Sequence, residues 1–89
     1  MKECTSLAKF KKKPTKEVVA QNMKMLEMGA KEGVKNHGIY WTLGRYDAVG
    51  IFEAPNEKEA MKLSIRLEEN VASETMIAIP VEEARKLAE

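Results

Sequence analysis

Residues 40–52 read Tyr-Trp-Thr-Leu-Gly-Arg-Tyr-Asp-Ala-Val-Gly-Ile-Phe and hold four of the five aromatic residues of the chain. The side chains alternate on either side of Gly44-Arg45, which is the pattern of a β-hairpin. A two-residue loop at this pair puts Gly44 where a type II′ turn needs a positive φ. This register pairs Trp41 with Ala48 and Tyr40 with Val49, and residues that lie directly opposite share a face of the sheet.

Both faces of the predicted hairpin are too apolar to stay in water. One face carries Ile39, Trp41, Leu43, Tyr46, Ala48, Gly50 and Phe52, and the other carries Tyr40, Thr42, Asp47, Val49 and Ile51. Because monomers seldom expose large apolar patches, helices should cover one face and a second copy of the chain the other. We expect Val49 and Ile51 under the helices. The predicted interface with the partner sheet consists of Ile39, Trp41, Leu43 and Phe52. The reverse assignment of the two faces is the alternative, and it also requires a homodimer or higher oligomer. A three-residue loop would shift the register by one residue and re-sort both faces.

Extended and helical patterns alternate along the rest of the chain. Pro14, Pro55 and Pro80 each end an extended segment and precede a helical pattern, as suits a residue that holds its predecessor in extended geometry. Two further strands are expected over 5–10 and 73–79. The order β-α-β-β-α-β with a short C-terminal helix predicts an α+β, ferredoxin-like antiparallel sheet with helices on one face. We expect one domain over residues 1–89.

Composition excludes several classes of function. Fifteen basic and fourteen acidic residues give a net charge of +1, which provides no global attraction to nucleic acid or to a membrane surface. Cys4 is the single cysteine, so no intrachain disulfide is possible. No run of roughly 18 apolar residues is present to span a bilayer, and no apolar run follows the N-terminus as in a signal peptide. We therefore expect a cytoplasmic protein.

The basic segment 9–13, Lys-Phe-Lys-Lys-Lys, prompts comparison with RNA-recognition motifs, which share this strand order. Those domains stack bases on aromatic side chains at two positions of their third strand. Asp47 and Val49 occupy these positions here. We therefore expect no nucleic-acid partner. A single histidine, His37, and the lack of a ligand-spaced His/Cys/Asp/Glu cluster also predict no metal site, and we expect no cofactor.

Polar side chains within the hairpin are the candidate ligand contacts: Tyr40, Thr42, Arg45, Tyr46 and Asp47. Asp47 is the candidate catalytic residue, because a carboxylate beside two phenols and a hydroxyl suits a general base. A structural role is the alternative: Asp47 can accept hydrogen bonds from Thr42 or nearby backbone amides and fix the register. Arg45 either contacts an anionic ligand or is solvated at the turn.

Residues 40–49 and the following Ile51-Phe52-Glu53-Ala54-Pro55 resemble the signature of the GYD-domain family, whose name is echoed by Gly44, Tyr46 and Asp47. Ser73-Glu74-Thr75 fits the same pattern, and the resemblance covers nearly the whole chain. It implies a ferredoxin-like fold of the dimeric α+β-barrel kind, in which two sheets pack face to face. Some proteins of that class are small monooxygenases or isomerases with a pocket between sheet and helices. The resemblance implies no particular reaction for this family.

Two hypotheses of function follow. In the first, a homodimeric α+β barrel holds a small apolar or mixed-polarity molecule near Tyr40, Thr42, Tyr46 and Asp47. Any catalysis would then be cofactor-free, by proton abstraction, isomerisation or monooxygenase-like chemistry, with Asp47 as base. In the second, the domain is a non-catalytic assembly or regulatory module that binds an effector. An enclosed cavity beside the hairpin would favour the first, and a packed interior the second.

Overall fold

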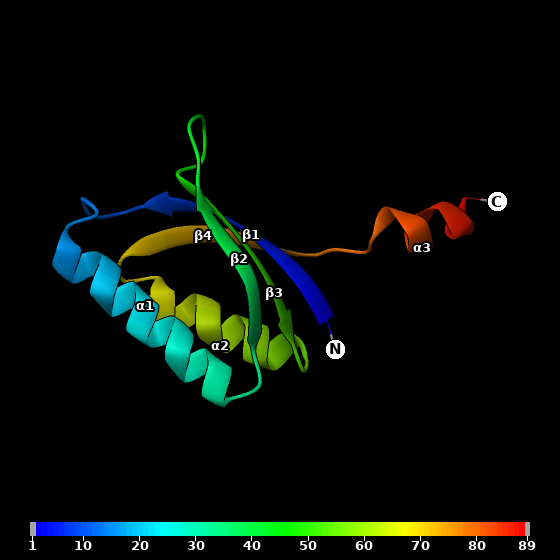
Figure 1. The fold of residues 1–89 in the computed structure, drawn as a ribbon, viewed down its shortest axis with the longest axis horizontal. Coiled ribbons are helices and arrows are strands. Elements are labelled where there is room, and N and C mark those ends of the chain that lie inside the picture. Colours follow the sequence, from blue (N-terminus) through cyan, green and yellow to red (C-terminus); the bar gives the residue numbers. More distant parts are fainter. Residues whose placement is uncertain (1, 89) are drawn as a thin grey trace.

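The computed structural model describes residues 2–88, and these form one four-stranded antiparallel sheet with three helices. The elements are β1 (Lys2–Phe10), α1 (Lys16–Lys31), β2 (Lys35–Trp41), β3 (Ala48–Ala54), α2 (Glu57–Leu67), β4 (Val71–Ile77) and α3 (Val81–Leu87). The strand order is β2-β3-β1-β4, and α1 and α2 lie together on one side of the sheet (Figure 1). This architecture confirms the predicted ferredoxin-like plan. None of the helices within the described residues is long and apolar enough to cross a bilayer.

Side-chain caps fix where the two large helices begin. Thr15 Oγ1 accepts a hydrogen bond from the backbone N–H of Val18 at 3.3 Å. Asn56 Oδ1 accepts one from the backbone N–H of Glu59 at 3.0 Å. Such caps satisfy backbone donors that the first turn leaves free. Each helix therefore starts directly after its strand-ending proline, as the sequence predicts.

The hairpin has the predicted register but a longer connection. Trp41 pairs with Ala48 and Tyr40 pairs with Val49. Regular pairing stops at Trp41 and resumes at Ala48, although the Thr42 N–H still donates to the Asp47 carbonyl at 2.8 Å. Gly44 has a φ of +134°, a value that L side chains rarely adopt. The connection is thus an irregular loop over 42–47, held closed at its base.

The assignment of the sheet faces was wrong. Phe52, 7% exposed, lies in the core with Cys4 and Ala54 of the sheet and with Val34, Ala60 and Leu63 from the helix side. Alternation then puts Ala48 and Trp41 on the helix side and turns Val49 and Ile51 away from it. The reason lies in β1, because Cys4, Ser6 and Ala8 let helices approach closely, whereas Thr5, Leu7 and Lys9 on its other side are larger or polar.

The sheet face turned away from α1 and α2 is called the open face below. Its apolar centre consists of Leu7, Tyr40, Val49, Ile51 and Met76, and its border carries Glu3, Lys9, Lys35, Glu53 and Glu74. Of the predicted interface residues, Phe52 is buried in the chain's own core and Leu43 lies fully exposed in the 42–47 loop. Ile39 and Trp41 lie on the helix side. A partner sheet would therefore meet the open face, not the face that was predicted.

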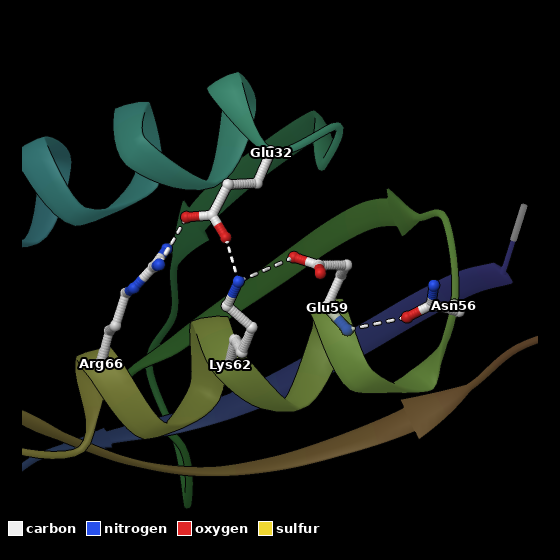
Figure 2. A network of polar contacts seen from close by, with 5 residues as sticks. All are labelled: Glu32, Asn56, Glu59, Lys62 and Arg66. Atoms are coloured by element: carbon white, nitrogen blue, oxygen red, sulfur yellow. Dashed lines mark hydrogen bonds and ion pairs between the residues drawn. The ribbon is translucent and has the colours of Figure 1, made fainter.

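Ion pairs brace the two helices at the end where the core is buried. Glu32, directly after α1, pairs with Lys62 and Arg66 of α2 (Figure 2). Lys62 also approaches Glu59 Oε2 at 3.5 Å. The hydrogen bond from Lys62, followed by that from Arg66, lowers the pKa of the Glu32 carboxyl below its ordinary value of 4.5. The C-terminal end of α1 is thereby tied to α2.

The third helix lies apart from the rest of the chain. Figure 1 shows α3 at the end of an extended segment that continues from β4, with the strands between it and α1. No residue of α3 is buried, and Val81 and Leu87 are 74% and 78% exposed. The sequence predicts this helix, but nothing in its pattern indicates that it stands clear of the sheet.

Candidate functional site

A cleft of about 140 Å³ lies between α1 and the helix side of the sheet, at the hairpin end of the molecule. Its floor comes from the four strands, its roof from α1, and one side from α2. Its lining includes Ser6, Ala8, Phe10, Val19, Asn22, Met23, Trp41, Gly50, Ser64 and Ser73. Among the described residues that line it, none has a titratable side chain. The cleft is therefore mostly apolar, with a few hydroxyl and amide groups.

Small residues on the central strands create the hollow. In the middle of the sheet Ser6 lies opposite Gly50, and Ala8 lies opposite Ala48. A Cβ atom added at Gly50 would meet nothing within 4 Å. The buried core lies farther along the same strands, around Phe52 and Cys4. Because interiors pack densely, a floor that lacks side-chain volume leaves space that another molecule can fill.

Aromatic residues stand at the hairpin end of the cleft. The Phe10 and Trp41 rings meet edge to face, with centroids 5.2 Å apart and planes at 67°. Trp41 keeps 60% of its surface exposed, and Met23 on α1 is also largely exposed. Large apolar side chains that remain accessible beside a hollow are typical of ligand sites. This end of the cleft therefore suits an apolar or aromatic group.

Hydroxyl groups are gathered at the opposite side of the cleft, towards β4. Thr75 Oγ1 donates to Ser6 Oγ at 3.3 Å and lies 3.2 Å from Ser64 Oγ. Ser6 and Ser64 both line the cleft, together with Ser73. A hydroxyl both donates and accepts, so this chain of hydroxyls can bind an alcohol, carbonyl or amide group.

A buried amide orients the polar residue of the roof. Asn70, in the turn before β4, donates from Nδ2 to Asn22 Oδ1 at 3.1 Å and to Gln21 Oε1 at 3.3 Å. Its own Oδ1 is buried and has no hydrogen-bond partner among the described residues. Asn22 lines the cleft, and this contact holds its amide in one orientation, with the nitrogen free to donate. The link also fastens α1 to the end of α2.

A second hollow of about 320 Å³ is wider but opens broadly to solvent at the edge formed by β4 and α2. Lys2 and Glu57 pair across it at 3.4 Å, and Cys4 lies in its wall. Burial, and to a lesser extent the charge of Glu57, raises the pKa of the Cys4 thiol. The thiol is thus protonated and a poor nucleophile at neutral pH. The narrower apolar cleft is the better candidate site.

The hairpin residues predicted to bind a ligand do not line this cleft. Tyr40 lies on the open face, where its ring covers Gly38 so closely that an added Cβ would come within 2.7 Å of the Tyr40 hydroxyl oxygen. Thr42 Oγ1 donates to the Tyr46 carbonyl at 2.8 Å, within the loop. Arg45 is exposed in the same loop. Their side chains are thus spread over the loop and the far side of the sheet.

Tyr46 and Asp47 fasten the loop to neighbouring strands. The Tyr46 hydroxyl donates to Glu74 Oε2 of β4 at 3.0 Å, and this hydrogen bond raises the pKa of Tyr46 above its ordinary value of 10.0. Asp47 Oδ2 accepts from the backbone N–H of Phe10 at 2.8 Å, while the Asp47 N–H donates to the Ala8 carbonyl at 2.8 Å. The carboxylate accepts a backbone amide, as in the structural alternative, but that amide belongs to Phe10 of β1, and the Thr42 hydroxyl bonds to Tyr46 instead. The structural and the catalytic role both stay predictions.

Sequence reasoning missed the residues that build the cleft. The available signal was the run of small residues at alternate positions of the first strand, Cys4, Ser6 and Ala8, matched by Gly50 in the hairpin. Isolated glycines within strands often mark a close approach of another group. Among residues 2–88, no three His, Cys, Asp or Glu side chains gather closely enough to hold a metal ion.

Comparison with known proteins agrees with this architecture. The GYD domain family model matches residues 6–88, which is nearly the whole chain. The chain belongs to the GYD domain family. In this GYD domain, Gly44 turns the loop while Tyr46 and Asp47 bind β4 and β1. The residues that echo the family name thus hold the hairpin in place.

A solved structure described as "crystal structure of FFRP-DM1" resembles this GYD domain. The TM-score is 0.62 at 24% sequence identity, and the alignment covers 89% of this chain and 100% of that chain. At this identity the likeness shows a shared fold. A search of curated proteins found no match.

Proposed function

We propose that this GYD domain is a binding module that holds one small, mainly apolar molecule with a polar end in the cleft between α1 and the sheet. The observation that carries the proposal is the unfilled floor at Gly50, where no atom lies within 4 Å of an added Cβ. Empty apolar cavities of about 150 Å³ are known to take up a single aromatic ring. The cleft, at about 140 Å³, is of that size.

The lining favours binding over catalysis. General acid–base chemistry needs a titratable side chain within hydrogen-bond reach of the substrate. The described lining residues provide hydroxyls and amides instead, and the Asp47 carboxylate already accepts the Phe10 N–H. The cleft itself is what the first hypothesis expects, and the chemistry of its lining supports binding of a small molecule without isomerase or monooxygenase catalysis.

Dimerisation belongs to the same proposal. The open face presents Leu7, Val49 and Ile51 at its centre, and a second copy that packs its own open face there would remove them from water. Charges of both signs on the border would suit a two-fold arrangement, since acidic and basic residues can then meet. The single cysteine is buried within the chain, which fits a cytoplasmic protein whose thiols stay reduced.

Titration of the protein with indole, benzyl alcohol and toluene tests the binding site. We expect saturable shifts of the Trp41 side-chain N–H signal in ¹⁵N-edited NMR spectra, with benzyl alcohol binding more tightly than toluene because its hydroxyl can reach the Ser6–Ser64 side. Gly50→Val should abolish binding by filling the floor. Ser64→Ala should remove the preference for the alcohol and leave toluene binding unchanged.

Two outcomes would contradict the proposal. One is unchanged binding of all three probes to Gly50→Val. The other is the absence of any saturable response in the unmodified protein at millimolar probe concentration. Ile51→Val, on the opposite side of the same strand, is the matched control and should bind like the unmodified protein.

A further inference from the structure

The segment from Ile79 to Leu87 forms an arm whose apolar side chains are exposed and not packed on the sheet or on α1 and α2. Val81, Ala84 and Leu87 recur every three residues and form one stripe along α3. Ile77 and Ile79 just before the helix are more than half exposed. Isolated helices shorter than about 12 residues are marginal in water, because nucleation costs more than a few hydrogen bonds return. A seven-residue helix therefore needs a partner surface.

The shape of the chain shows that the arm does not return to its own body. The radius of gyration is 13.7 Å, against about 12 Å expected for a compact chain of 89 residues. The longest dimension is 48 Å and the next is 31 Å. Figure 1 shows that this length comes from α3, which lies across the sheet from α1. The arm thus projects away from the helix layer, on the side where the sheet lacks cover.

The area of the open face indicates which partner the arm needs. Four strands about 4.8 Å apart, with about seven residues rising 3.4 Å each, give a face of roughly 450 Å². Stable specific interfaces bury about 800 Å² on each partner. Because this is a flat area and interface sizes count the larger solvent-accessible surface, the open face can approach the size of a standard interface only if nearly all of it is buried. An arm carrying Ile79, Val81 and Leu87 supplies additional apolar area next to it.

We propose that α3 is an exchange arm, which packs against a second copy of the chain at the border of that copy's open face when the two open faces meet. Two-fold symmetry makes the exchange reciprocal, so each dimer contains two such contacts. The inference rests on the proposed dimer and adds the part of the chain that stabilises it.

Sedimentation equilibrium of the full chain and of two double variants tests the arm. V81S/L87S replaces the two ends of the apolar stripe. E82S/K86S places the same two serines on the opposite face of α3 and removes one charge of each sign. We expect V81S/L87S to raise the dimer dissociation constant by about tenfold or more, since apolar side chains lose their burial in both arms. The control should change it by less than about threefold.

The outcomes distinguish a failure of the proposed arm from a failure of the proposed dimer. A wild-type dimer that V81S/L87S weakens no more than the control does would overturn the arm and leave the proposed dimer standing. A wild-type chain that stays monomeric at millimolar concentration would overturn both. Amide exchange gives an independent readout, because the hydrogen-bonded amides of residues 83–87 should be protected only at concentrations where the dimer forms. Protection of α3 in the dilute monomer would show packing on its own body and would also overturn the proposal.

Discussion

The two ends of the helix–sheet interface are built from the same strands and differ in how they are filled. At one end Phe52 fills the space between β3 and the helices, with Cys4, Ala54 and Leu63 around it, and Phe52 and Leu63 also form the wall that closes the cleft on this side. At the other end Gly50 and Ser6 occupy the corresponding row and leave a cleft of about 140 Å³. The difference shows that a shift of two residues along β3, from Phe52 to Gly50, takes the strand from a filled core to an unfilled space. Stability should depend on the first end and ligand binding on the second.

Phe52→Ala should break the packed end and have the largest effect. Loss of a buried phenylalanine costs about 3–5 kcal/mol, which is a large share of the 5–15 kcal/mol that typically stabilises a domain. Met23→Ala at the cleft end is the matched change and should cost less than about 1 kcal/mol, because Met23 is half exposed. Urea unfolding followed by circular dichroism measures both. Equal losses would mean that the two ends are packed alike.

Asp47→Ala should loosen the wall of the cleft end. The substitution leaves the Phe10 N–H without its 2.8 Å acceptor and should lower the free energy of unfolding by about 1–3 kcal/mol. Asp47→Asn keeps an acceptor oxygen and should restore at least half of the loss. Urea unfolding of the two variants provides the comparison. If Asp47→Ala is as stable as the unmodified protein, the carboxylate does not hold the hairpin.

Gly50→Val should fill the cleft end, so that its packing resembles that of the packed end. Valine replaces a flexible glycine in a strand and fills empty space, so the free energy of unfolding should rise by about 1 kcal/mol. Gly38→Val is the contrasting control on the adjacent strand, where the added Cβ would come within 2.7 Å of the Tyr40 hydroxyl oxygen, and it should destabilise the domain. Melting temperatures show whether each variant is stabilised or destabilised. A destabilised Gly50→Val would argue against empty space at this position.

Glu32→Gln probes the ion pairs that brace the packed end and should have the smallest effect. The folded pKa of Glu32 is lowered, so its ionised form stabilises the fold above the ordinary value of 4.5, and this contribution is lost as the pH falls through the lowered pKa. The melting temperatures of Glu32→Gln and the unmodified protein should therefore differ at pH 7, and the difference should shrink as the pH falls below 4.5. Glu27→Gln, also a glutamate of the α1 region, is the control. A difference that stays constant as the pH falls would contradict the electrostatic origin.

The fold could be predicted because its signals are local. The alternation around Gly44 specifies the register, and the proline-cap sequences before α1 and α2 specify where the helices start. The face under the helices could not be decided within the hairpin, since both faces are apolar. It depends on pairing with β1, whose Cys4 and Ser6 are small.

The cleft was harder to predict because it forms where the strands lack side-chain volume. The polar pattern of the hairpin predicted Tyr46 and Asp47 as ligand contacts. Their side chains instead bond to Glu74 of β4 and to the backbone of β1. An empty position such as Gly50 becomes a site only when the roof stays distant from it, and that distance depends on how α1 is held by Asn22 and Asn70. No short pattern in the sequence records such a distance.

The hydroxyl row has a consequence for communication between the two hollows. Ser64 and Ser73 border both of them, and Thr75 in the wider hollow is linked to Ser6 in the cleft. A hydroxyl carries a single proton, and Thr75 donates its proton to Ser6, so Ser64 is the donor to Thr75. A guest that takes the Ser64 proton would turn the Thr75 proton from Ser6 towards Ser64. A molecule bound in one hollow would then change the hydrogen bonds offered in the other without any backbone movement.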